Sequence, residues 1–206
     1  MKLPKLLIAG LLAACCLLPP QSAGATDEGR AAELIQTLGD KAFSTLQRPG
    51  MTLEERESAF AEILREGFDL DLIARFVLGK YWRQASDEQR DDYLRAFSDF
   101  VITTYARRLG GFTGQSFEII GTKQAGQKKD VLVSTRIDRP SGPPIQAAWR
   151  VRESDGQVRI IDVVVEGVSM AVTQRQEFAA VAKRSGIDGL VQVLRAQTQR
   201  MAAASG

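Results

Sequence analysis

The residue types best suited to acid–base chemistry are two carboxylates, Asp162 and Glu166, within the apolar run Ile160–Gly167. Burial in apolar surroundings raises the pKa of a carboxyl group, and such a group can act as a general acid or base. The structural alternative is favoured, because an isolated acid on a strand usually accepts a hydrogen bond from a backbone N–H or an indole. A carboxylate-based enzyme therefore stays open as the less favoured interpretation.

Composition excludes most other catalytic chemistry. The 206 residues include no histidine, which rules out Ser-His-Asp and Cys-His hydrolases and histidine-containing zinc sites. The two cysteines, Cys15 and Cys16, are adjacent near the N-terminus, so they neither cross-link distant segments nor form a metal site by themselves. The chain also lacks a glycine-rich phosphate loop and EF-hand spacing. Carboxylates, Lys and Tyr stay as the candidate acid–base groups, and we expect no metal and no other cofactor.

Residues 1–25 have the pattern of a secretory signal peptide. Two lysines precede the apolar run Leu6–Leu18, which is too short to span a bilayer comfortably. The small residues Ala23 and Ala25 match the site at which signal peptidase cleaves. We therefore expect a mature chain that covers residues 26–206.

Processing of the N-terminus also determines the charge. Cleavage after Ala25 removes Lys2 and Lys5 and no acid, which lowers the basic residues from 27 to 25 and matches them with 25 acidic residues. A neutral mature protein argues against nucleic-acid binding and against strongly electrostatic attachment to a membrane surface. The alternative processing, at a lipoprotein box formed by Leu12–Cys15, would leave Cys15 lipidated.

Helical periodicity dominates the first half of the mature chain. Apolar residues recur every three or four positions in four segments, which are 28–46, 52–67, 70–78 and 86–109. Thr52 with Glu55, and Ser86 with Gln89, have the spacing of capping boxes that begin the second and fourth helices. Helical periodicity returns in the last part of the chain and is interrupted at Gly186.

Between these helical regions the sequence predicts strands. Three runs alternate with a period of two and a fourth is apolar on nearly both faces: 116–121, 131–138, 145–152 and 158–165. The fourth run therefore predicts a central strand covered on both sides. Asp155-Gly156 predicts a type I′ turn whose register pairs Ser154 with Gln157, Val151 with Ile160, Trp149 with Asp162 and Ala147 with Val164. We expect one domain of the α+β class.

Apolar side chains gather in three regions of the mature chain. An aromatic and aliphatic stripe runs through 93–109, a second group comprises Phe76, Tyr81 and Trp82, and one face of the sheet carries Val131, Val133, Ile137, Trp149 and Val151. These side chains either pack together as a closed core or line an apolar cavity for a hydrophobic ligand. Periodicity does not separate the two alternatives, and the closed core is the default.

Two groups of motifs resemble the MlaC family, also called the toluene-tolerance Ttg2D family. The C-terminal group consists of Val165–Met170, followed by Thr173, Arg175, Glu177-Phe178 and Gly186–Leu190. The central group consists of Phe76–Arg83 with Glu88–Arg90, Phe97 and Tyr105, and the predicted sheet adds Ala148–Arg150 and Asp162. The resemblance covers essentially the whole chain, including the signal peptide.

The resemblance implies a periplasmic phospholipid carrier without enzyme activity. Its fold would be a twisted antiparallel sheet of about four strands, wrapped by N- and C-terminal helices around an apolar pocket. Such carriers move lipid between an outer-membrane lipoprotein–porin complex and an inner-membrane ABC transporter with an MCE-domain ring, and so maintain outer-membrane lipid asymmetry. A hopanoid or sterol-like lipid is the alternative ligand. The expected lipid-binding residues are Phe76, Tyr81, Phe97, Phe100, Val101, Tyr105, Val131, Val133, Ile137, Trp149, Val151, Val163 and Met170.

Overall fold

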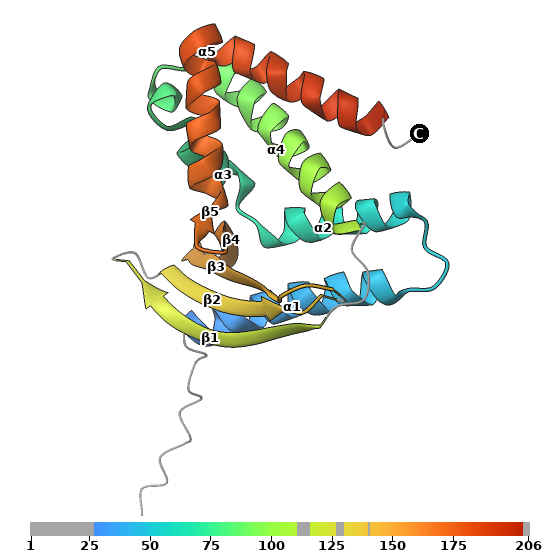
Figure 1. The fold of residues 1–206 in the computed structure, drawn as a ribbon. Helices are drawn as coiled ribbons and strands as arrows, with labels where there is room; N and C mark the ends of the chain where they lie inside the picture. Colours follow the sequence, from blue (N-terminus) through green and yellow to red (C-terminus); the bar gives the residue numbers. More distant parts are fainter. Residues whose placement is uncertain (1–26, 111–115, 127–129, 140, 204–206) are drawn as a thin grey trace, which may run out of the picture.

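The computed structural model describes residues 27–110, 116–126, 130–139 and 141–203 (Figure 1). In these ranges the chain forms α1 (Asp27–Gln47), α2 (Leu53–Gly67), α3 (Leu70–Leu78), the 3-10 helix η1 (Gly79–Arg83), α4 (Asp87–Gly110), β1 (Phe117–Ala125), β2 (Asp130–Ile137), β3 (Ile145–Ser154), β4 (Gln157–Val165), β5 (Val168–Ser169) and α5 (Met170–Ala203). This composition confirms the α+β class. The two-residue strand β5 adds to the four that the sequence predicts.

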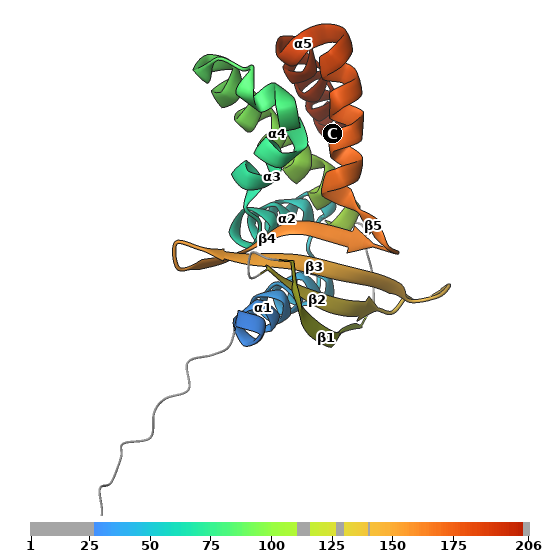
Figure 2. The same ribbon diagram turned by 90° about the vertical axis from the view of Figure 1, so that its left-hand side faces the viewer.

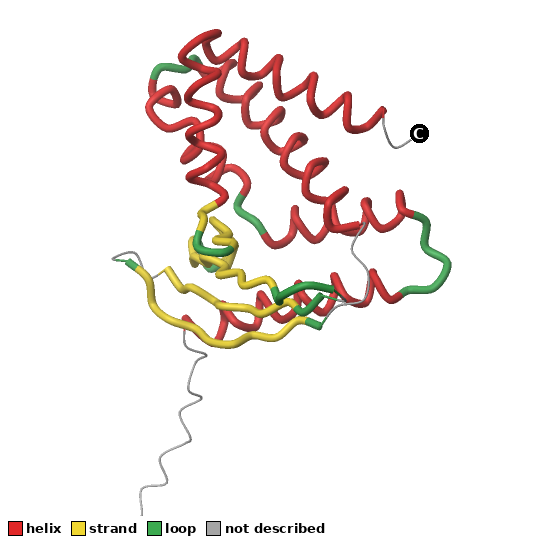
Figure 3. The backbone as a smooth tube through the Cα atoms, viewed as in Figure 1, coloured by secondary structure: helices red, strands yellow, loops and turns green. Residues whose placement is uncertain are grey.

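The strands form one twisted antiparallel sheet in the order β1-β2-β3-β4-β5. Figure 2 shows α1 along one face of this sheet and a layer containing α3, α4 and α5 on the other side. Figure 3, in which helices are red and strands yellow, shows the same helical layer beside the sheet. The expectation that β4 is central is wrong in position, because only the short β5 lies beyond it. Its two apolar faces are nevertheless both covered, one by α1 and the other by α3 and α5.

The register between β3 and β4 follows the prediction only near the turn. Ser154 pairs with Gln157 and Val151 with Ile160, as expected, but Trp149 lies opposite Val163 and Ala147 opposite Val165. The cause is a β-bulge, in which β4 has one extra residue, Ile161, between its partners of Val151 and Arg150. The bulge places Trp149 and Val163 together on the α1 side of the sheet.

Local sequence signals determine where several helices begin and break. Both predicted capping boxes are present as reciprocal hydrogen bonds, between Thr52 and Glu55 and between Ser86 and Gln89. The interruption at Gly186 is a kink inside α5, where the backbone has φ 70° and ψ −175°. Only glycine adopts this conformation without strain.

Candidate functional site

The apolar face of the sheet packs against α1. Val131, Val133, Val151 and Ile160 are at most 2% exposed and contact the buried face of α1, which carries Ala31, Ile35 and Leu38. Partly buried side chains surround this group, which we call the sheet–α1 cluster: Leu34, Ile63, Phe68, Phe117, Ile119, Trp149, Val158 and Val163. The bulge in β4 brings Val163 into this set, because without it Asp162 would lie opposite Trp149.

Trp149 is anchored at its polar end within this cluster. Its indole Nε1 donates a hydrogen bond of 2.9 Å to the Thr135 hydroxyl, and that hydroxyl donates to the Ala147 carbonyl oxygen at 3.2 Å. On its apolar side the indole lies edge-on to Phe68, with ring centroids 6.5 Å apart. The ring is therefore held between the sheet and the segment that joins α2 to α3.

A second apolar group, which we call the helical cluster, lies between α3, α4 and the two parts of α5. Phe97 and Tyr93 are buried at its centre, and both contact the ring of Phe178 at centroid distances of 6.1 and 6.5 Å. The Tyr93 hydroxyl donates to the Ala74 carbonyl oxygen at 3.1 Å, and burial raises the pKa of this hydroxyl. Other members include Tyr81, Phe100, Val101, Leu190 and Leu194.

A third, smaller group joins α2 to α4 and touches the first. Phe60, Leu64, Ile102 and Ala106 are its buried members, and Tyr105, Ile63 and Phe68 pack against it. Burial raises the pKa of the Tyr105 hydroxyl, an effect that the nearby Arg108 guanidinium partly opposes. Because Ile63 and Phe68 also belong to the sheet–α1 cluster, apolar contact is continuous from the sheet to α4 through these two side chains.

The link between α2 and α3 is attached to β4 by backbone contacts. The Asp69 N–H donates to the Ile160 carbonyl oxygen at 2.9 Å, and Phe68 forms a parallel bridge with Ile160. The Asp69 carboxylate meanwhile accepts the Leu72 N–H at 2.9 Å and caps α3. One residue therefore ends the link, begins the helix and contacts the sheet beside the β-bulge.

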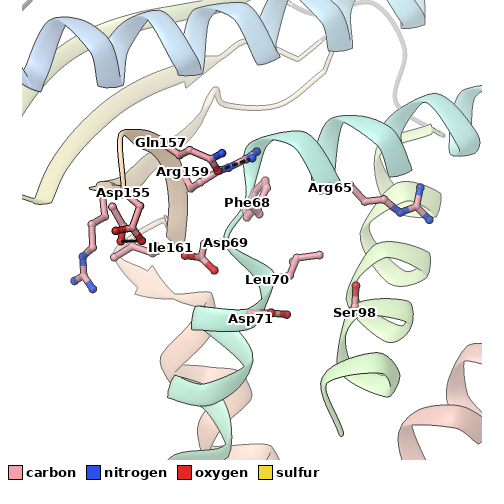
Figure 4. Close-up of a pocket in the computed structure, with 12 residues that line it drawn as sticks. Arg65, Phe68, Asp69, Leu70, Asp71, Ser98, Asp155, Gln157, Arg159 and Ile161 are labelled. Atoms are coloured by element: carbon pink, nitrogen blue, oxygen red, sulfur yellow. Dashed lines mark hydrogen bonds between the residues drawn. The ribbon is translucent and has the colours of Figure 1, made fainter. Parts of the chain in front are cut away.

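A surface pocket of about 430 Å³ opens at this junction (Figure 4). Figure 4 shows Phe68 and Leu70 between the β3–β4 hairpin on one side and Arg65 and Ser98 on the other. The wall combines apolar, cationic and anionic side chains: Arg65, Phe68, Asp69, Leu70, Asp71, Ser98, Arg152, Ser154, Asp155, Gln157, Arg159 and Ile161. Phe68 thus lines the pocket and also contacts Trp149 in the sheet–α1 cluster.

The residues predicted to bind lipid fall into separate places. Val131, Val133, Trp149, Val151 and Val163 belong to the sheet–α1 cluster; Tyr81, Phe97, Phe100 and Val101 belong to the helical cluster; and Tyr105 packs in the third group. Phe76 is 41% exposed on α3, while Ile137 and Met170 are half-buried outside these groups. None of these thirteen residues lines the pocket in Figure 4. Their contact with a ligand stays a prediction.

Sequence reasoning missed the pocket because its wall comes from element ends. Phe68 follows α2 directly and belongs to no periodic stripe, and the hairpin residues are polar. The nearest signals were the N-cap Asp69 and the turn Asp155-Gly156, each of which marks the end of an element. Neither signal indicates that the two ends meet in space.

The two carboxylates that were candidates for catalysis have structural partners. Asp162 accepts the Ser169 hydroxyl at 2.6 Å and the Ala171 N–H at 3.1 Å, so it secures the start of α5. Glu166 accepts the Gln146 N–H at 2.9 Å and lies in the turn between β4 and β5. Among the residues that the structure describes, no three His, Cys, Asp or Glu side chains are arranged to hold a metal ion. No helix in the described ranges has the length and apolar character needed to cross a membrane.

These features define an α+β protein whose sheet is covered by helices on both faces and whose interior is continuously apolar from the sheet to α4. The chain belongs to the MlaC family, because the model of the MlaC protein matches residues 36–196.

Two curated relatives agree with this assignment. The chain is 26% identical over 165 residues to the intermembrane phospholipid transport system binding protein MlaC of Haemophilus influenzae, an alignment that covers 77% of each chain. It is 24% identical over 131 residues to the toluene tolerance protein ttg2D of Pseudomonas putida, covering 63% of this chain and 60% of the relative. The names of these relatives describe phospholipid transport and toluene tolerance, and neither name is that of an enzyme.

A solved structure shares the fold. The phospholipid-binding protein of Ralstonia solanacearum, in complex with a phospholipid, is 25% identical and superimposes with a TM-score of 0.72. The superposition covers 84% of this chain and 98% of the Ralstonia chain.

Proposed function

We propose that this chain is a periplasmic phospholipid carrier, which buries acyl chains in its apolar interior. The observation that carries the proposal is its likeness to the Ralstonia protein, which was solved with a phospholipid and is covered along 98% of its length. The proposed route of the lipid is between an outer-membrane lipoprotein–porin complex and an inner-membrane ABC transporter with an MCE-domain ring. This route would maintain the lipid asymmetry of the outer membrane.

The physical requirement on such a carrier is a dry apolar surface. Each acyl CH₂ group is stabilised by ~0.8 kcal/mol when it leaves water, so an acyl chain moves from a bilayer to a protein only if the protein buries it equally well. Buried polar groups at such a surface must already have partners, because an unpaired one would oppose the apolar ligand. The Trp149 indole meets this condition through Thr135.

We place the acyl chains on the sheet–α1 side, at the contact between Phe68 and Trp149. Phe68 lines the surface pocket and touches the apolar interior, so it lies between solvent and the sheet. Val163, opposite Trp149 in the sheet, is half-buried and extends the apolar wall. The helical cluster is the less suitable site, because three rings, Phe97, Tyr93 and Phe178, already fill its centre with mutual contacts.

Secretion to the periplasm is supported by the pattern of residues 1–25, which lie outside the described part of the chain. The mass of the purified mature protein tests it directly. Cleavage after Ala25 gives a chain beginning at Thr26, whereas lipoprotein processing gives a lipidated chain beginning at Cys15. The mass of the intact precursor would contradict both predictions.

Native mass spectrometry of the protein purified from a bacterial periplasm tests the function. A mass increment equal to that of a phospholipid is the expected result. An increment equal to that of a hopanoid would mean that the protein is a lipid carrier with a different class of ligand. A protein without any bound lipid, which also takes up none from phosphatidylethanolamine vesicles, would contradict the proposal.

Two matched variants test the placement of the acyl chains. Val163→Glu and Val101→Glu put the same charge at half-buried valines, one in the sheet–α1 cluster and one in the helical cluster. Both should lower the free energy of unfolding, but only Val163→Glu should abolish the lipid load of the folded fraction. Loss of lipid in Val101→Glu alone would show that the acyl chains bind in the helical cluster.

A further inference from the structure

The C-terminal end of α3 is surrounded by cations that stack on aromatic rings. The Arg75 guanidinium lies 5.2 Å from the ring centroid of Trp82, and the Lys80 ammonium lies 5.2 Å from that of Tyr81. From the neighbouring α5, the Arg175 guanidinium lies 5.0 Å from the Phe76 ring. In Figure 1, α3 lies beside the first part of α5, which begins directly at β5.

Four of the cations in this region are not neutralised by ion pairs. Arg75, Lys80, Arg83 and Arg175 are exposed, and no Asp or Glu among the described residues lies within 4.0 Å of their charged nitrogens. Arg90, which also stacks on Trp82, differs because it pairs with Asp87 at 2.9 Å. The mature chain is neutral overall, so this is a local excess of positive charge.

Two large apolar side chains are exposed among these cations. Phe76 is 41% exposed, and Val172 on α5 is 44% exposed one helical turn before Arg175. An apolar side chain at the surface needs no explanation when it is isolated. Here Phe76 lies under the Arg175 guanidinium, and Val172 is one helical turn from the same arginine. We call these six residues, Arg75, Phe76, Lys80, Arg83, Val172 and Arg175, the α3–η1 surface.

We propose that the α3–η1 surface docks transiently on an anionic phospholipid bilayer. Cations contact the phosphate groups of anionic lipids, and aromatic and aliphatic side chains enter the region below them. A bilayer supplies both kinds of contact at once, with lipid phosphates for the cations and acyl chains for Phe76 and Val172. Without residues 1–25 the whole chain is neutral, so the residues outside this surface carry a net charge of −4. Binding through only four cations is therefore weak and sensitive to salt. The proposal does not depend on what the interior holds.

Flotation with vesicles tests the docking. The mature protein is mixed with vesicles of phosphatidylcholine and phosphatidylglycerol in equal amounts, or of phosphatidylcholine alone, at low and high salt. The protein should float with the anionic vesicles at low salt and be released at high salt. Lipid that stays with the unfloated protein is measured separately, so failure of docking and failure of lipid carriage give different results.

Charge reversal identifies the surface responsible. Removing one cation near an anionic membrane weakens binding about fivefold, so Lys80→Glu with Arg83→Glu should weaken it at least about twentyfold. The matched control is Arg48→Glu with Lys123→Glu, which makes the same change of net charge at two exposed cations on the α1–α2 turn and on β1. Neither of these cations pairs with a carboxylate in the described part of the chain. If both double variants lost vesicle binding equally, the loss would come from the change in net charge and not from this surface, and the proposal would be overturned. Absence of wild-type binding to anionic vesicles at low salt would overturn it too, and would leave a protein as the partner of this surface.

Discussion

The indole N–H of Trp149 on β3 donates to the hydroxyl of Thr135 on β2 at 2.9 Å, and the Thr135 side chain is fully buried. The same hydroxyl donates a hydrogen bond to the Ala147 carbonyl oxygen. The Thr135 Oγ1 atom is therefore both the acceptor for the indole and the donor to the backbone. This bond fixes the ring that faces Phe68 and Val163. A polar pair therefore orients the apolar wall to which we assign the acyl chains.

Replacing Thr135 by Val should destabilise the protein more than its small change of shape would suggest. The substitution keeps the volume but leaves the indole N–H of the partly buried Trp149 without its acceptor, which costs about 1–3 kcal/mol. Urea unfolding of Thr135→Val, Trp149→Phe and the double variant measures the coupling. We expect Thr135→Val to cost clearly less when Trp149 is already Phe. An identical cost in both backgrounds would mean that the bond contributes nothing to stability.

Asp162 should behave as a structural residue and not as a catalytic base. Asn at this position keeps one acceptor oxygen but loses the charge that faces the first turn of α5, so Asp162→Asn should lower the free energy of unfolding by about 1–2 kcal/mol. The lipid load of the folded fraction should be unchanged. Asp99→Asn, an exposed site on α4, is the control and should change stability by less than about 0.5 kcal/mol. An Asp162→Asn protein with the same free energy of unfolding as wild type would contradict the role of Asp162 in securing the start of α5.

Most of the secondary structure was predictable because its signals are local. The capping box of Thr52 and Glu55 needs only two residues three apart in the chain, and the kink at Gly186 needs only a residue that tolerates positive φ. The register beyond the β3–β4 turn was not predictable in this way. The extra residue Ile161 is a property of a strand pair, since its effect appears only where β4 meets β3.

The candidate site was predictable in its residue types but not in its grouping. Phe97 and Val133 are both buried, as their periodicity indicated, yet one belongs to the helical cluster and the other to the sheet–α1 cluster. Which apolar faces meet depends on the path of the chain, and periodicity reports only that a face is apolar. Phe68 was missed for the opposite reason, because it joins two clusters from a position between two helices.

Acid should weaken the protein partly through Asp130. This carboxylate is 4% exposed; it accepts two hydrogen bonds from Arg152, at 2.7 and 2.9 Å, and one from Arg150 at 3.4 Å. Burial alone would raise its pKa, but the two guanidinium groups outweigh burial and hold the pKa of Asp130 below its usual range.

The pH dependence follows from the sign of this shift. A lowered pKa in the folded state stabilises the protein at pH values above the pKa of the unfolded chain, about 3.9, and this stabilisation disappears as the pH falls through the folded pKa. The difference in unfolding free energy between wild type and Asp130→Asn should therefore be largest near neutral pH and shrink below about pH 4. Urea unfolding at several pH values measures it, and a constant difference would contradict the ion-pair role.

Gly186→Ala should destabilise the helical layer without emptying the proposed lipid site. The kink at φ 70° and ψ −175° costs a non-glycine residue about 1–3 kcal/mol, and it directs Leu190 and Leu194, both fully buried, into the helical cluster. Gly121→Ala is the control, because a Cβ there would meet no atom within 4 Å. Since the helical cluster is separate from the sheet–α1 cluster, Gly186→Ala should unfold at lower urea while its folded fraction carries a normal amount of lipid. A folded Gly186→Ala protein that had lost its lipid would instead show that the kinked helix forms part of the binding site.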